Sequence, residues 1–295
     1  MRRERRAGYS LFPIPYSLFP IPYSLFPHGF SEMTSRTATQ SASAPAVARI
    51  GWIVDVQNDF MLPPEQGGRL YVHDLFDDGS DRGAIQIVPR LVEAVDWMRA
   101  HCDAIVYTGD WHAMDDAEIN PVAPDASKGT YPPHCMGLSD DPAEREGAFV
   151  IQEIRPANPL VLPRDASAAD AREAARRAVD ERRPVFIQKS LFSVFEGNPA
   201  TDALLQAFRE RLDAPLEVVM IGVARDVCVK GALEGMLERR IPVTLVTDAT
   251  WGLGLEPEPD ALARWMNDGA ALVTTRGLEL RGGETERDRA VAAAA

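Results

Sequence analysis

The chain alternates short apolar runs with longer segments of helical periodicity, and this alternation restricts the fold more than any other feature. Apolar runs that suit buried strands occur at 47–54, 104–108, 184–188, 216–223, 243–246 and 271–274. Helical patterns lie between them, at 88–102, 166–183, 199–212, 226–239 and 259–267. Strands that alternate with helices form a parallel sheet with right-handed crossovers. The sequence therefore predicts a single α/β domain over residues 46–276, with a doubly wound, mostly parallel sheet and helices on both faces.

Two local expectations complete this outline. A further strand is expected at 148–154, and Asp165 is expected to cap the helix at 166–183. The stretch 109–147 is rich in Pro, Gly and Asp and carries no clear strand or helix pattern. A loop of that length inside a compact domain is usually functional or disordered.

The segments outside this domain have a different composition. The heptapeptide that begins at Tyr9 recurs unchanged from Tyr16, and a third copy begins at Tyr23. A perfect repeat favours a short DNA repeat read in frame, and its prolines break helices. The arginines at the start resemble a signal peptide, but the regular prolines make a poor apolar region. We therefore expect residues 1–45 to be a disordered extension, with the natural start at Met33, and residues 277–295 to be a disordered tail.

Composition excludes several classes of partner. The formal net charge is −13, whereas nucleic acid and anionic membranes require a basic face. No apolar run approaches the roughly 20 residues of a membrane-spanning helix. Three cysteines are too few for a disulfide framework, and their odd number leaves at least one free. We therefore expect a reduced, cytoplasmic setting.

Three residues of complementary chemistry stand where predicted strands end. Asp55 follows the run at 47–54, Lys189 follows the run at 184–188, and Cys228 opens the helical pattern after 216–223. Ligands of open parallel sheets bind outside the carboxyl ends of the strands, so these three side chains can converge. An acid, a cation and a thiol at one site suit a cysteine nucleophile with its base.

Each of the three residues also has a simpler interpretation. Asp55 alone fits a turn cap, Lys189 alone fits a solvated charge, and buried structural cysteines are common. A cysteine at a helix N-terminus, in contrast, is favoured as a thiolate and titrates below its free pKa of about 8.5. The occurrence of all three at strand ends favours the catalytic interpretation.

Longer motifs around these residues resemble those of the isochorismatase-like cysteine hydrolases. Residues 222–229 read GVARDVCV, which is similar to the Gly-x-Ala-x-Asp-x-Cys-Val motif of that superfamily. Residues 53–60, IVDVQNDF, resemble its opening strand, and the likeness spans most of residues 46–276. The resemblance implies that Asp55, Lys189 and Cys228 form a catalytic triad. It also implies that the backbone N–H groups of Ala224 and Cys228 form an oxyanion hole, behind a cis peptide bond between Val223 and Ala224.

A second set of residues resembles the metal site of the nicotinamidases within that superfamily. Asp110-Trp111-His112 contains their Asp-x-His pair, and Tyr131-Pro132-Pro133-His134-Cys135 matches their aromatic-Pro-Pro-His-Cys string. Carboxylates with imidazoles suit Zn²⁺, Mn²⁺ or Fe²⁺, although a lone Asp-x-His pair is common on surfaces. The resemblance implies one divalent ion, with Zn²⁺ preferred, held by Asp110, His112, Glu118 and His134. Glu118 stands where many nicotinamidases have histidine, and the neighbouring Asp115 and Asp116 are competitors for that position.

The resemblance also implies a substrate. Phe60 and Tyr131 fall where relatives place aromatic walls around a pyridine ring, although such residues pack in cores equally often. We expect a metal-dependent cysteine amidohydrolase that converts nicotinamide to nicotinate and ammonia through a thioester, in NAD salvage, and that assembles as a homo-oligomer. The long span between His134 and Lys189 and the segment 190–197 depart from compact nicotinamidases. A related amidase for another amide or ureido compound therefore stays open, whereas a non-catalytic scaffold has no need of an intact triad.

Overall fold

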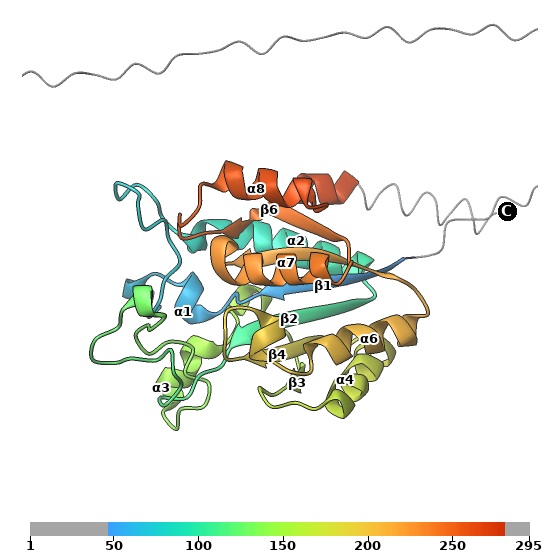
Figure 1. Ribbon diagram of the computed structural model, residues 1–295, viewed down its shortest axis with the longest axis horizontal. Helices are drawn as coiled ribbons and strands as arrows, with labels where there is room; N and C mark the ends of the chain where they lie inside the picture. Colours follow the sequence, from blue (N-terminus) through green and yellow to red (C-terminus); the bar gives the residue numbers. More distant parts are fainter. Residues whose placement is uncertain (1–46, 281–295) are drawn as a thin grey trace, which may run out of the picture. The chain divides into compact units, whose positions relative to one another are not determined.

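The computed structural model describes residues 47–280 (Figure 1), and the predictions for residues 1–45 and for the end of the tail lie outside this range. Seven strands form one sheet: β1 (Ala48–Val54), β2 (Ala104–Asp110), β3 (Leu160–Leu162), β4 (Val185–Lys189), β5 (Leu216–Val223), β6 (Val243–Trp251) and β7 (Ala271–Val273). Their order is β3-β4-β2-β1-β5-β6-β7, and every pairing between described strands is parallel. The predicted doubly wound α/β fold is confirmed.

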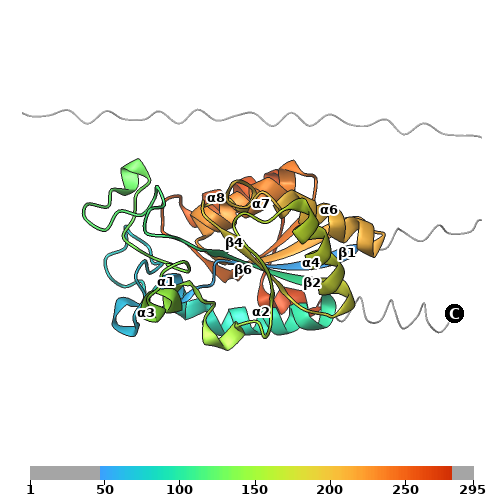
Figure 2. The ribbon, with the colours of Figure 1, turned by 90° about the horizontal axis from the view of Figure 1, so that it is seen from below.

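Helices cover both faces of the sheet. The longer ones are α2 (Val88–His101), α4 (Ala168–Asp180), α6 (Thr201–Leu212), α7 (Lys230–Glu238) and α8 (Glu258–Asn267). Short ones lie in the connections: α1 (Asn58–Met61), α3 (Pro142–Arg145) and α5 (Val194–Gly197). Figure 2 shows α2 on one side of the sheet and α6 and α7 on the other, and the two hydrophobic cores follow this division. Because β1 is buried from both sides, it carries an almost uninterrupted apolar run.

Three local predictions are wrong. Residues 148–154 form no strand; two 3₁₀ turns, Glu146–Ala148 and Gln152–Ile154, flank a single bridge between Gln57 and Val150. Helix α4 is capped by Ser167 instead of Asp165, because the Ser167 hydroxyl accepts from the N–H of Asp170, whose carboxylate accepts from the N–H of Ser167. The domain also continues past residue 276, since residues 275–280 are helical and Leu278 is buried.

The strand register brings distant residues to one edge of the sheet. Asp110 of β2 pairs directly with Lys189 of β4, and Val54 of β1 pairs with Gly222 of β5. At Gly222 the backbone φ is +124°, and a Cβ there would lie 2.0 Å from the carbonyl oxygen of Val54. Only glycine permits so close an approach. Strand β1 has β2 on one side and β5 on the other, so the order of the strands reverses beside β1. Open α/β sheets bind ligands in the crevice at such a point.

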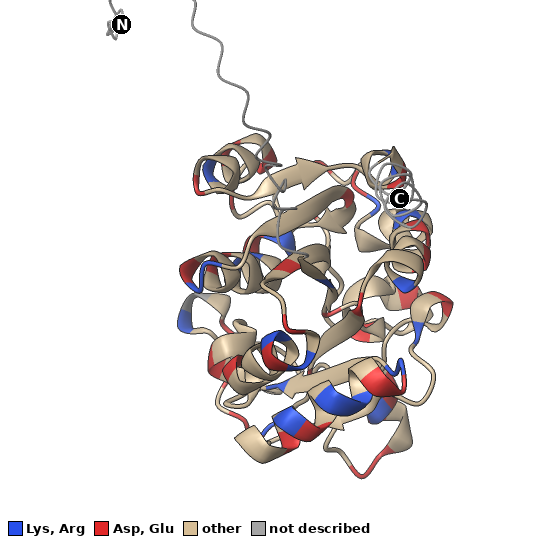
Figure 3. Ribbon diagram, turned by 90° about the vertical axis from the view of Figure 1, so that its right-hand side faces the viewer, with Lys and Arg blue, Asp and Glu red and all other residues tan. Residues whose placement is uncertain are grey.

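Charges of both signs are mixed on the surface. In the view of Figure 3, Lys and Arg stand beside Asp and Glu along the helices, as in the pairs of Arg176 with Glu173 and of Arg177 with Glu181 on α4. This pattern differs from the single basic face that nucleic-acid binding requires. Within residues 47–280, no helix is both long and apolar enough to cross a membrane.

Candidate active site

The crevice brings together the three residues predicted from the strand ends. The Nζ atom of Lys189 lies 2.8 Å from Oδ2 of Asp55 and 3.8 Å from Sγ of Cys228. All three residues are buried, with exposed fractions of 1% for Lys189, 0% for Asp55 and 6% for Cys228. The predicted convergence of an acid, a cation and a thiol is therefore present.

Lys189 is the centre of a small charge network. Its ammonium group also pairs with the carboxylate of Asp110 and donates to the carbonyl oxygen of Leu191 at 3.1 Å. Single ligand atoms of Asp55, Asp110 and Cys228 lie within 4.8 Å of one another, which would also suit a metal ion. The lysine ammonium already supplies the positive charge that these buried groups need, so this cluster is an ion-pair network.

The two buried carboxylates of this network have different proton affinities. Burial raises the pKa of Asp55, and the nearby charge of Lys189 opposes this only in part. For Asp110, burial acts in the same direction, but Lys189, His112 and His134 outweigh it and hold its pKa below the usual value. Burial would lower the pKa of Lys189, yet Asp110 and Asp55 raise it well above normal. Asp110 and Lys189 are therefore the stable ion pair, and Asp55 is the more basic acid.

The expected low pKa of Cys228 is not found. Cys228 lies within a π-helical turn, Arg225–Val229, that precedes α7. Burial raises the pKa of its thiol well above the ordinary value; Lys189 lowers it, while Asp55 and Asp110 raise it further. The resting group is thus a thiol. Oδ2 of Asp55 accepts no aligned hydrogen bond although Lys189 is near, which leaves this oxygen available to take up the thiol proton.

The backbone beside Cys228 has the conformation that the resemblance implies. The peptide bond between Val223 and Ala224 is cis. The carbonyl oxygen of Ala224 accepts from the N–H groups of Val227 and Val229, each at 3.0 Å, and these bonds hold the turn. Ala224 and Cys228 both line the cavity described below.

The four residues predicted to hold a metal also lie together. One ligand atom from each of Asp110, His112, Glu118 and His134 lies within 4.8 Å of the others. Nε2 of His112 and Oε1 of Glu118 are 2.9 Å apart, yet both are buried and neither has a hydrogen-bond partner. Two unsatisfied atoms beside a further carboxylate and imidazole form a donor set for a divalent ion. The residues therefore fit the implied metal.

Hydrogen bonds orient both imidazoles for this purpose. Nδ1 of His134 donates to the carbonyl oxygen of Pro132 at 2.8 Å, and Nδ1 of His112 donates to the carboxylate of Asp116 at 3.0 Å. Each bond leaves Nε2 as the free ligand atom. The bond to His112 also decides between the acidic candidates, because Asp116 is engaged with Nδ1 and Asp115 is exposed. Glu118 is the acid that joins the group.

Gln57 and Asp59 support the site, although no role was predicted for them from the sequence. Both lie in the opening-strand motif at residues 53–60. The side chain of Gln57 donates to the carbonyl oxygens of Asp110 and Ala148, each at 2.7 Å, and accepts from the N–H of Asp110 at 2.8 Å. The carboxylate of Asp59 accepts from the N–H of Cys135 at 2.6 Å. Their position in the motif IVDVQNDF was the only feature of the sequence that could have indicated these roles.

A cavity of about 390 Å³ opens above these groups. Asp110, His134 and Cys228 contribute its polar floor. Phe60 packs on His134 with ring centroids 5.6 Å apart, and Tyr131 meets Phe192 edge-to-face at 5.7 Å. The remaining lining is largely apolar, including Leu70, Val72, Leu75, Val227, Leu253 and Leu255. The two aromatic residues predicted from the sequence thus border the cavity.

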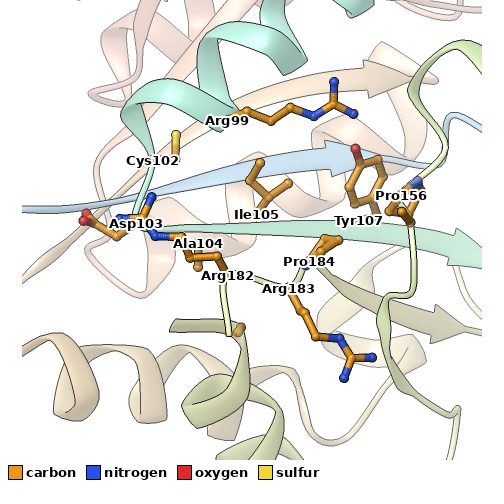
Figure 4. Close-up of a pocket in the computed structure, with 12 residues that line it drawn as sticks. Arg99, Cys102, Asp103, Ala104, Ile105, Tyr107, Pro156, Arg182, Arg183 and Pro184 are labelled. Atoms are coloured by element: carbon orange, nitrogen blue, oxygen red, sulfur yellow. The ribbon is translucent and has the colours of Figure 1, made fainter. Parts of the chain in front are cut away.

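A second hollow of about 390 Å³ lies at the opposite end of β2 (Figure 4). Its lining includes Arg99, Cys102 and Tyr107 and none of the residues predicted for the site. Burial raises the pKa of the Cys102 thiol to about 12, so this cysteine is a poor nucleophile. Because the two volumes are equal, the chemistry of the lining and the end of the sheet identify the site.

Comparison with known proteins places this geometry in a family. The family model of the Isochorismatase domain matches residues 52–277. The chain belongs to the isochorismatase family. The Escherichia coli (strain K12) nicotinamidase is 25% identical over 235 residues, which cover 72% of this chain and 86% of that protein. The predicted membership of this family, as an enzyme of the hydrolase class, is confirmed.

Solved structures share the fold of this isochorismatase-family chain. The pyrazinamidase/nicotinamidase of Streptococcus mutans UA159 superposes with a TM-score of 0.53 at 17% identity, covering 77% of this chain and 100% of that one. The nicotinamidase/pyrazinamidase of Bacillus subtilis gives 0.52, also at 17% identity and with the same coverage. At such low identity these structures establish the common fold alone.

Proposed function

We propose that the chain is a metal-dependent cysteine amidohydrolase that converts nicotinamide to nicotinate and ammonia, a step of NAD salvage. The observation that carries this proposal is that Cys228, with Asp55 and Lys189 behind it, opens onto the same cavity as the metal-ligand group. The similarity to the nicotinamidase of Escherichia coli supports the choice of substrate. The cytoplasmic location and the homo-oligomeric state remain predictions.

The catalytic cycle follows from the proton affinities of the three buried residues. Asp55 takes the thiol proton while Lys189 remains an ammonium ion, and the Cys228 thiolate adds to the carboxamide carbon. The N–H groups of Ala224 and Cys228 would receive the developing oxyanion, a contribution of about 3–4 kcal/mol per donor in comparable sites. Asp55 then returns the proton to the departing ammonia, leaving a thioester. Attack by water releases the carboxylic acid and restores the thiol.

The ligand group would act on the other end of the substrate. A divalent ion held by Asp110, His112, Glu118 and His134 would bind the ring nitrogen and so position the carboxamide. Carboxylate and imidazole ligands suit Zn²⁺ first, with Mn²⁺ and Fe²⁺ as alternatives. Phe60 and Tyr131 border the space that a flat ring would enter.

The lining of the cavity supports this substrate against one form of the alternative, an amide or ureido compound that carries its own carboxylate. Among the described residues that line the cavity there is no Lys or Arg. Lys189 is buried behind the cavity and engaged with two carboxylates. A substrate that carries its own carboxylate would find no Lys or Arg side chain among these residues to pair with, and the divalent ion would have to hold the carboxylate in place of a ring nitrogen; a buried charge left without its partner costs about 3–5 kcal/mol. Neutral aromatic carboxamides are therefore favoured.

A substrate comparison tests the proposal directly. Ammonia release should be measured with nicotinamide, pyrazinamide and an N-carbamoyl amino acid at equal enzyme concentration. We expect kcat/KM for the two neutral amides to exceed that for the ureido acid by about 100-fold, since about 1.4 kcal/mol corresponds to each factor of ten. Faster hydrolysis of the ureido acid would reject the substrate class and leave the cysteine chemistry standing.

The pH dependence should report the base. Activity requires ionised Asp55, and burial raises the pKa of this carboxyl, so kcat/KM should fall as the pH decreases through that raised value. The Thr108 hydroxyl donates to Oδ1 of Asp55 at 2.6 Å and favours the charged form. Thr108→Val should raise the pKa of Asp55 further and move the acid limb of the profile to higher pH. An unmoved limb would show that another group sets it.

A further inference from the structure

Arg164 makes a two-armed contact with the loop that carries the metal-ligand group. Its Nη1 and Nη2 atoms donate to the two carboxylate oxygens of Asp116, each at 2.9 Å, and Nη1 also donates to the carbonyl oxygen of Trp111 at 3.0 Å. The planar guanidinium matches a carboxylate in this bidentate arrangement, which fixes orientation as well as distance. Arg164 thus holds both Asp116 and the backbone between Asp110 and His112.

Asp116 passes this constraint to His112. Besides Arg164, its Oδ2 atom accepts from Nδ1 of His112 at 3.0 Å and from the N–H of Ala113 at 3.1 Å. The bond to Nδ1 sets the plane of the imidazole ring and its tautomer, so that Nε2 faces Glu118. A continuous set of contacts therefore leads from Arg164 through Asp116 to a ligand atom.

We propose that Arg164 is a positioning residue for metal binding, an inference that rests on the proposed metal-dependent function. The fork of Arg164 locks the Asp116 carboxylate, and the carboxylate locks His112 in the orientation that the ion requires. Arg164 lies between β3 and α4, in the long span between His134 and Lys189. That span would then contribute to the active site through this side chain.

An alternative is that the pair is an ordinary surface ion pair of small energetic value. The chain contains a suitable comparison on α4, where Arg177 donates to both carboxylate oxygens of Glu181 at 2.7 and 3.1 Å. That pair is more exposed, at 35% and 39%, than Arg164 and Asp116, at 25% and 16%. Glu181 accepts from arginines alone among its described side-chain contacts, whereas Asp116 also holds His112.

Metal affinity measured on the full chain tests the inference. Zn²⁺ binding should be titrated against a chromophoric chelator, with the melting temperature of the metal-free protein recorded for each variant. We expect Arg164→Met to weaken Zn²⁺ binding about 10-fold, the lower end of the range for groups that orient metal ligands. Arg164→Lys keeps the charge without the fork and should also weaken binding. Arg177→Met, which removes a matched pair, should bind Zn²⁺ like the wild type.

A variant with both residues replaced shows whether Arg164 affects Zn²⁺ affinity through Asp116 or through a general loss of stability. Asp116→Asn should weaken binding at least as much as Arg164→Met, and the variant with both changes should lose less than the two single losses combined, because Asp116 accepts two of the three hydrogen bonds of Arg164. Additive losses, or equal losses in Arg164→Met and Arg177→Met, would overturn the inference. Wild-type Zn²⁺ affinity in Arg164→Met would also overturn the inference, but it would leave the proposed metal site standing. Failure of the wild type to bind Zn²⁺ would instead reject the proposed metal site.

Discussion

Replacing Cys228 with alanine should reduce nicotinamide hydrolysis by a factor on the order of 10³ or more, while the protein remains folded. The cycle proposed above needs this sulfur to form the thioester, and removal of a covalent nucleophile leaves only binding and polarisation of the substrate. Cys228 occupies the turn before α7 and borders the cavity. Ammonia release under saturating substrate, with the melting temperature and metal content of the variant, provides the measurement.

Two further variants make this result specific. Asp55→Asn should be about as inactive as Cys228→Ala, since groups that act as a unit fail together. Cys102→Ala should keep wild-type activity, because Cys102 lines the hollow at the other end of β2 and its thiol has a pKa of about 12. A Cys228→Ala protein with a rate near that of the wild type would exclude the thioester route.

Much of the sheet was predictable because its strands are buried on both faces. The strand at 216–223 was predicted with the bounds that β5 has, since an apolar run following Pro215 has clear limits. The positions of Asp55, Lys189 and Cys228 at strand ends were sufficient to predict their convergence, because parallel strands share one carboxyl edge. The metal-ligand group was predicted from motif resemblance, and the strand pairing of Asp110 with Lys189 explains why it borders the triad.

Other features depend on the three-dimensional surroundings. The apolar segment 148–154 has a strand-like composition, but its backbone forms only one isolated bridge, between Val150 and Gln57, and no extended ladder. The position of Cys228 in sequence suggested a lowered pKa, yet burial, which a linear pattern does not report, raises it. Arg164 carried no signal because its partner Asp116 is 48 residues away. These failures concern environment and long-range pairing.

Within the metal-ligand group, replacement of His112 should have the largest effect on metal content. Elemental analysis of the purified protein should find about one divalent ion per chain, and His112→Ala should contain far less. Nε2 of His112 is a buried atom 2.9 Å from Oε1 of Glu118, with no aligned partner among the described residues. Removal of this imidazole leaves two carboxylates and one histidine, a set that binds Zn²⁺ more weakly.

Loss of the ion should lower activity because the substrate is then no longer held in position. We expect kcat/KM for nicotinamide to fall about 100-fold or more in His112→Ala and in chelator-treated enzyme, since small displacements of a reacting group have effects of that size. The loss should occur mainly as a higher KM if the ion holds the ring. His101→Ala is a suitable control, because His101 ends α2 and stacks on Trp97 away from the crevice. Full activity of metal-free enzyme would reject the role of the ion, and with it the preference for pyridine carboxamides, without affecting the chemistry assigned to Cys228.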